Sequence, residues 1–198
     1  MESETIESAS TALIGRPATT SPVARRDRPL AVERRPGLVG VAARGLVRGM
    51  AGGVIATAAM SALMLGAQKA GLMGQMPPTK ITNSMLGALG IRRKTPEPAK
   101  KALAVLTHFA FGGACGALFG AASAVAHERS RSSPLARDPR LATLAGVLYG
   151  SAIWATSYAG WVPAFGIMPR PENDRPGRPT SMVLAHWVFG AVLAKVAG

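Results

Sequence analysis

Two histidines lie inside long uncharged stretches of this chain, and their types and spacing suit chemistry better than any other residues present. His108 begins the run His-Phe-Ala-Phe-Gly and His186 begins the run His-Trp-Val-Phe-Gly, so both runs share the form His, aromatic, any residue, Phe, Gly. An ionisable side chain within an apolar segment usually faces other protein segments and often marks a functional site. The sequence therefore predicts His108 and His186 as a candidate functional pair.

Three roles are open to this pair. Each imidazole can form a structural hydrogen bond across helices. An imidazole also changes charge near physiological pH, so the pair can serve a proton-responsive or proton-conducting path. Two histidines at one depth, each followed four residues later by glycine, can in addition ligate a haem iron as a bis-histidine pair. Zinc would lack its third and fourth ligands, so no metal and no resident cofactor is assigned.

The sequence contains no pattern that indicates an enzyme. It has no phosphate-binding glycine-rich loop with lysine, no metal-binding motif and no nucleophile elbow. The apolar stretches carry no carboxylate for acid-base catalysis. Cys115, the single cysteine, has small apolar neighbours and is interpreted as a packing residue. We therefore expect a non-enzymatic protein.

Composition indicates what surrounds the chain. Hydrophobic residues make up 48% of the 198 residues and charged residues only 17%, below the roughly 25% of ordinary soluble domains. The net charge of +13 comes from basic residues that lie mainly outside the apolar stretches. This distribution is typical of a membrane protein that touches anionic lipid headgroups, so we expect the lipid bilayer and no nucleic acid as partner.

Four apolar stretches have the length of a bilayer crossing, at about 1.5 Å per residue for a core about 30 Å thick. The predicted fold class is therefore all-α, a polytopic membrane protein with four transmembrane helices. Residues 1–40 are rich in Ser, Thr, Pro, Arg and Glu and predict a disordered basic tail, ahead of a membrane domain over residues 41–198. The predicted spans are residues 49–67, 102–126, 141–162 and 180–197.

The repeated histidine run predicts two similar helix pairs, the first span with the second and the third with the fourth, related as parallel repeats. Small residues also recur at four-residue spacing, which places them on one helix face and lets helix backbones approach closely. Such faces can pack within one chain or form a homo-oligomer, and both alternatives are open. The predicted packing residues are Gly49, Gly53, Gly112, Gly116, Gly120, Gly146, Gly150 and Gly190.

Between the first two spans, residues 71–101 contain Ile81, Met85 and Leu86 at the spacing of one apolar face of a short helix. This helix is expected either at the headgroup level or packed on the end of the bundle. Basic residues are slightly more numerous on the side of the tail, which favours both termini in the cytoplasm.

Several short motifs give the chain a family resemblance over residues 41–198. These are residues 49–60, Gly71-Leu72-Met73-Gly74 leading to Pro77-Pro78, 108–112 with Gly116 and Phe119-Gly120, 163–169, and 186–190. At these positions the chain resembles the YagU-like group of small bacterial inner-membrane proteins. The resemblance implies a four-helix protein of the bacterial inner membrane and supplies no reaction, substrate or functional residue. The long polar tail departs from the pattern of the group.

Taken together, these patterns predict a non-enzymatic integral membrane protein, structural or stress-related, whose helices pack through glycine faces. One alternative is a small proton-sensitive transporter or channel component that uses His108 and His186. A second alternative is a membrane cytochrome with a bis-histidine haem.

Overall fold

The regular elements of this chain are all helices over the residues that the structure describes. The computed structural model describes residues 37–130 and 138–197, which belong to one unit. The predicted all-α class is confirmed over these ranges. The elements are α1 (Leu38–Lys69), α2 (Pro77–Ala88), α3 (Glu97–Arg129), α4 (Pro139–Thr156), a π-helix (Ser157–Trp161), α5 (Val162–Ala164), a 3-10 helix (Pro171–Asn173) and α6 (Arg178–Ala197).

Three of these helices, α1, α3 and α6, are long and apolar enough to cross a membrane. They contain the first, second and fourth predicted spans. The third predicted span, residues 141–162, is helical from Pro139 onward and continues through the π-helix into α5. Within the described ranges α4 is not among the helices that reach this apolarity, because it begins with Pro139 and Arg140 and carries several hydroxyl-bearing residues.

Helix α1 begins at Leu38, well before the predicted start of the first span at residue 49. Residues 38–40 of the predicted tail thus form the start of α1, and residues 1–36 of it lie outside the described part of the chain. The prediction began the apolar stretch at residue 49, after Arg44 and Arg48. Both arginines are exposed, whereas Gly45 and Gly49 are buried on another face of the same helix. A helix continues through charged residues when they all lie on its exposed side.

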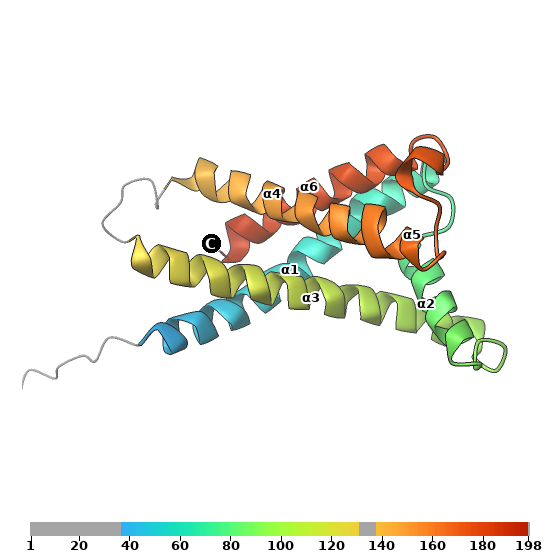
Figure 1. Ribbon diagram of the computed structural model, residues 1–198, viewed down its shortest axis with the longest axis horizontal. Coiled ribbons are helices and arrows are strands. Elements are labelled where there is room, and N and C mark those ends of the chain that lie inside the picture. Colours follow the sequence, from blue (N-terminus) through green and yellow to red (C-terminus); the bar gives the residue numbers. More distant parts are fainter. Residues whose placement is uncertain (1–36, 131–137, 198) are drawn as a thin grey trace, which may run out of the picture. The chain divides into compact units, whose positions relative to one another are not determined.

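Helices α1 and α3 lie side by side, as Figure 1 shows, and their backbones touch at glycines. A Cβ atom on Gly49 would lie 2.8 Å from the Cα of Gly120, and one on Gly53 would lie 3.0 Å from the Cα of Gly116. Real Cβ atoms do not approach backbone so closely. Any larger residue at these positions would force the two helices apart.

Helices α4 and α6 form a second contact of the same kind. A Cβ atom on Gly146 would lie 2.7 Å from the Cβ of Ala194, and one on Gly190 would lie 2.6 Å from the carbonyl carbon of Gly146. Helix α6 also packs against α1, where Gly52 faces the side chains of Leu193 and Ala197. The contact between α1 and α6 therefore joins the two helix pairs.

Helix α2 packs against α3. It begins with Pro77 at its first position, where the missing N–H of proline costs no helical hydrogen bond. Thr82 and Leu86 are buried, while Met85 and Leu89 are 53% and 69% exposed. The apolar face expected from the sequence is thus only partly covered by α3.

Candidate functional site

His108 and His186 line one cavity of about 230 Å³. His108 lies on α3 and His186 on α6, and each is four residues from a glycine at which its helix touches the partner helix. The structure therefore brings together the two histidines that the sequence predicts as a pair.

Five helical segments contribute to the wall of this cavity, and its lining is mainly apolar. Four methionines and three aromatic side chains (Phe or Trp) contribute to it, and no lysine, arginine, aspartate or glutamate is among the described residues that line it. The walls come from α1 (Thr57, Met60, Met64), α2 (Pro77, Pro78, Ile81, Met85), α3 (Thr107, His108, Phe111, Gly112, Cys115), the π-helix and its neighbours (Ile153, Ser157, Trp161, Val162) and α6 (Met182, His186, Phe189).

The backbone and the ring of His186 are both held in place. Its carbonyl group faces Gly150 at the crossing of α4 and α6, where a Cβ atom on that glycine would lie 3.1 Å from the carbonyl carbon of His186. Its Nδ1 lies 2.7 Å from the carbonyl oxygen of Met182. Because a carbonyl oxygen only accepts, Nδ1 carries the hydrogen, and the neutral ring then presents a lone pair on Nε2.

His108 has a different environment. Its Nε2 is buried and has no hydrogen-bond partner, and its ring lies edge-on to Phe109, with ring centroids 6.2 Å apart. A buried polar atom without a partner costs on the order of 1–3 kcal/mol. Such an atom in a native protein calls for a partner that completes it.

The hydroxyl groups of the cavity wall donate to backbone oxygens of their own helices. Thr57 Oγ1 donates to Gly53 O at 2.7 Å, Thr107 Oγ1 to Leu103 O at 2.8 Å and Ser157 Oγ to Ile153 O at 2.6 Å. Their hydrogens are therefore engaged, and each oxygen keeps only acceptor capacity toward the cavity. The two imidazoles remain the most adaptable polar groups in the wall.

A π-helix over Ser157–Trp161 shapes one side of the cavity. The amide of Val162 bonds to Ser157 O, five residues earlier, which inserts one extra residue into the helical ladder. Its side chains point to two places, since Ser157 and Trp161 line the cavity while the hydroxyl of Tyr158 donates to Asp174 Oδ2 at 2.7 Å. Single π-turns of this kind are frequent at functional sites.

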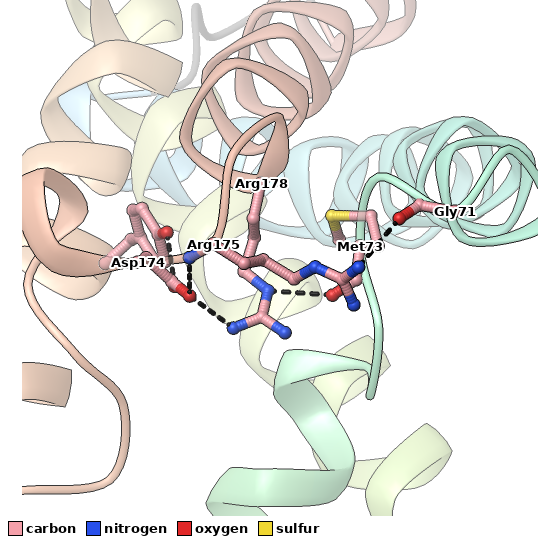
Figure 2. A network of polar contacts seen from close by, with 6 residues as sticks. Gly71, Met73, Asp174, Arg175 and Arg178 are labelled. Atoms are coloured by element: carbon pink, nitrogen blue, oxygen red, sulfur yellow. Dashed lines mark hydrogen bonds and ion pairs between the residues drawn. The ribbon is translucent and has the colours of Figure 1, made fainter.

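Sequence analysis missed a buried ion pair at the start of α6. Arg178 Nη1 lies 2.6 Å from Asp174 Oδ1, and the two side chains are only 6% and 3% exposed. Figure 2 shows this pair joined to the link between α1 and α2: Arg178 Nε donates to Met73 O at 2.8 Å. Nearby, Arg175 Nη2 donates to Gly71 O at 3.1 Å. The network ties the start of α6 to the end of α1.

The same network explains a glycine motif in the link after α1. Gly71 and Gly74 have φ values of 78° and 62°, in the left-handed region that favours glycine. A Cβ atom on Gly74 would also lie 2.6 Å from Nη1 of Arg175. These glycines therefore turn the chain so that its carbonyl groups meet the two arginines.

A sequence signal for this pair existed, because Asp174 and Arg178 are four residues apart just before a helix. The expectation that basic residues outside the apolar stretches touch lipid headgroups obscured this signal. Arg178 is buried and paired, so it does not act as a headgroup cation.

Neither a group of metal ligands nor a similar protein assigns a role to these residues. No group of three or more His, Cys, Asp or Glu side chains placed to hold a metal ion occurs within residues 37–130 and 138–197. Comparison of the chain with family models, curated proteins and solved structures found no match. The function must therefore be argued from the geometry.

Proposed function

We propose that this chain is a non-enzymatic integral membrane protein with four spans in two similar helix pairs, α1 with α3 and α4 with α6. The main support for membrane insertion is the large apolar side chains exposed on the outside of the helices. Only 28% of the most apolar stretch of α3 is buried, and Val105, Leu106 and Leu118 on α3 are 58%, 65% and 68% exposed. In water these faces would form a large apolar patch, which a soluble monomer rarely tolerates.

The interior contacts support the same proposal. Lipid tails are as apolar as leucine, so helices in a bilayer gain little from burying apolar side chains against each other and associate through close backbone packing. Gly53 faces Gly112 and Gly146 faces Gly190 at corresponding positions of the two pairs. This correspondence supports similar pairs, and α4, extended through the π-helix to α5, completes the fourth span.

The proposed location is the bacterial inner membrane with both termini in the cytoplasm, in line with the resemblance to the YagU-like group. In this orientation the link after α2 faces the periplasm. Arg92, Arg93 and Lys94 in this link are exposed and offer trypsin a cleavage site.

Insertion and orientation can be tested together. We expect the protein to stay in the membrane pellet after a carbonate wash, because its apolar faces are solvated by lipid. Trypsin added to spheroplasts should cut within Arg92–Lys94, and trypsin added to inverted vesicles should leave this site intact. Folded protein in the aqueous fraction would refute insertion, whereas cleavage only in inverted vesicles would refute the orientation alone.

A second candidate function is a proton-sensitive transport component, which the shared cavity of His108 and His186 favours. In liposomes with a pH-sensitive dye inside, this function requires a proton flux that is lost in the His108→Ala, His186→Ala double variant. The matched control is His127→Ala, an exposed histidine on α3 outside this cavity. Equal flux in liposomes with the wild type and with the double variant would exclude this role for the histidines.

The geometry does not favour the haem alternative. A cavity of about 150 Å³ holds one benzene molecule, and the histidine cavity, at about 230 Å³, is not large enough for a macrocycle of four pyrrole rings. We therefore assign no cofactor to the two histidines.

A further inference from the structure

We propose that the histidine cavity is a binding site for an uncharged, membrane-soluble molecule with an apolar body about the size of two fused aromatic rings and one hydroxyl group, which donates to Nε2 of His186. The size follows from the cavity volume of about 230 Å³. This is roughly one and a half times the space that holds benzene. The route by which the ligand arrives rests on the membrane insertion proposed above, whereas the other parts of the proposal do not.

The lining determines that the ligand is apolar and uncharged. Met60, Met64 and Met182 are at most 6% exposed and place flexible thioethers around the space, and such side chains adapt to an irregular apolar body. The described wall offers no charged group to pair with an ion, and burying an unpaired charge is strongly unfavourable.

The imidazoles determine that the ligand carries a hydroxyl group. Nδ1 of His186 donates to Met182 O. In the neutral ring Nε2 is therefore an acceptor that can bind a hydrogen-bond donor on the ligand. Four buried side-chain atoms lack a partner in the described residues, and His108 Nε2 is the only one of them that belongs to a residue of this cavity. A hydroxyl group both donates and accepts. The hydroxyl group of the ligand can therefore donate to Nε2 of His186 and accept from the ring of His108. The His108 ring reaches this position by turning about its χ2 bond, which is a broad torsion.

The rim indicates that the ligand enters from the bilayer. Met85 on α2, Phe111 on α3 and Trp161 on the π-helix line the cavity and are 53%, 47% and 36% exposed. An apolar rim between helices that face lipid opens toward acyl chains and not toward water. The π-turn that brings Trp161 to this rim is an independent mark of a functional site.

The test uses 1-naphthol and naphthalene, which differ by the hydroxyl group alone. Each is titrated into the full-length protein in lipid nanodiscs, with empty nanodiscs subtracted, and binding is followed by calorimetry. We expect the wild type to bind 1-naphthol roughly tenfold more tightly than naphthalene, the effect of one buried hydrogen bond. Cys115→Phe, which fills part of the cavity, should weaken binding of both compounds at least fivefold.

Two substitutions of His186 separate binding from structure. In His186→Asn the amide can still donate to Met182 O but nothing replaces Nε2, so the preference for 1-naphthol should disappear. In His186→Gln the amide reaches the place of Nε2, so most of the preference should remain. His127→Asn is the matched control and should bind as the wild type does.

Equal affinity of the wild type for the two compounds would overturn the proposal, and so would binding that Cys115→Phe leaves unchanged. A preference that survives in His186→Asn would overturn the role of His186. The carbonate wash reports membrane insertion without any ligand, so the failure of this proposal and that of the proposed function are distinguishable.

Discussion

Gly116→Ala is expected to lower the free energy of unfolding by about 3 kcal/mol, at the upper end of the range for overpacked sites. A Cβ atom on Gly116 would lie 2.6 Å from the Cα and 2.8 Å from the amide nitrogen of Gly53, and neither backbone atom can turn aside as a side chain would. Helices α1 and α3 must therefore separate along their contact. Titration of the purified protein from a mild detergent into SDS, followed by tryptophan fluorescence, measures the change.

Two other glycines provide matched controls for this substitution. A Cβ atom on Gly113 would lie 3.6 Å from side-chain atoms of Met50 and Val54, an ordinary contact, and one on Gly66 would meet nothing within 4 Å. Since alanine favours a helix over glycine by up to about 1 kcal/mol, Gly113→Ala and Gly66→Ala should leave stability unchanged or raise it. Equal destabilisation by all three substitutions would show that close backbone packing is not what holds α1 to α3.

Arg178→Leu is expected to lower the free energy of unfolding by about 3–5 kcal/mol, the usual cost of removing one partner of a buried ion pair. The substitution leaves the carboxylate of Asp174, whose side chain is 3% exposed, without its cation. It also removes the donor to Met73 O. The same SDS titration measures the loss, and the link between α1 and α2 should become more accessible to protease.

The neighbouring Arg175 provides the comparison for Arg178. Its side chain forms one hydrogen bond, to Gly71 O, and the residue is exposed, so Arg175→Leu should cost about 1 kcal/mol or less. Adding Asp174→Asn to Arg178→Leu should recover part of the lost stability, because it removes the unpaired charge. If Arg178→Leu lowered the free energy of unfolding no more than Arg175→Leu does, the buried ion pair would not stabilise the protein as we infer.

The helices of this protein could be predicted from apolar length, because a run of about twenty uncharged residues leaves few other structures. The start of α1 could not, because Arg44 and Arg48 lie on its exposed face and interrupt the apolar run without interrupting the helix. The hydroxyl-bearing residues of α4 lower its apolarity, and their hydroxyl groups are satisfied within the helix. Thr143, Ser151 and Thr156 each donate to a carbonyl of the preceding turn.

The candidate site could be predicted as a pair of histidines but not as a cavity. The shared run and the position of each histidine in its predicted span predict a similar depth for His108 and His186. The space between them depends on α2 and on the extra residue of the π-helix, and neither shows in a count of apolar residues. The spacing of Asp174 and Arg178 is compatible with an ion pair, but its burial could not be predicted, because it depends on Tyr158 and on a loop from a distant part of the sequence.

The way in which the helices pair also bears on the biogenesis of this protein. Helix α1 packs on α3 and α4 packs on α6, so each pair consists of neighbours along the chain. The ribosome synthesises α1 and α3 before α4 and α6. The glycine contact between α1 and α3 can therefore form as soon as α3 leaves the exit tunnel. The contact of α1 with α6 then comes last, as a docking of two finished halves, and the histidine cavity exists only once that docking has taken place.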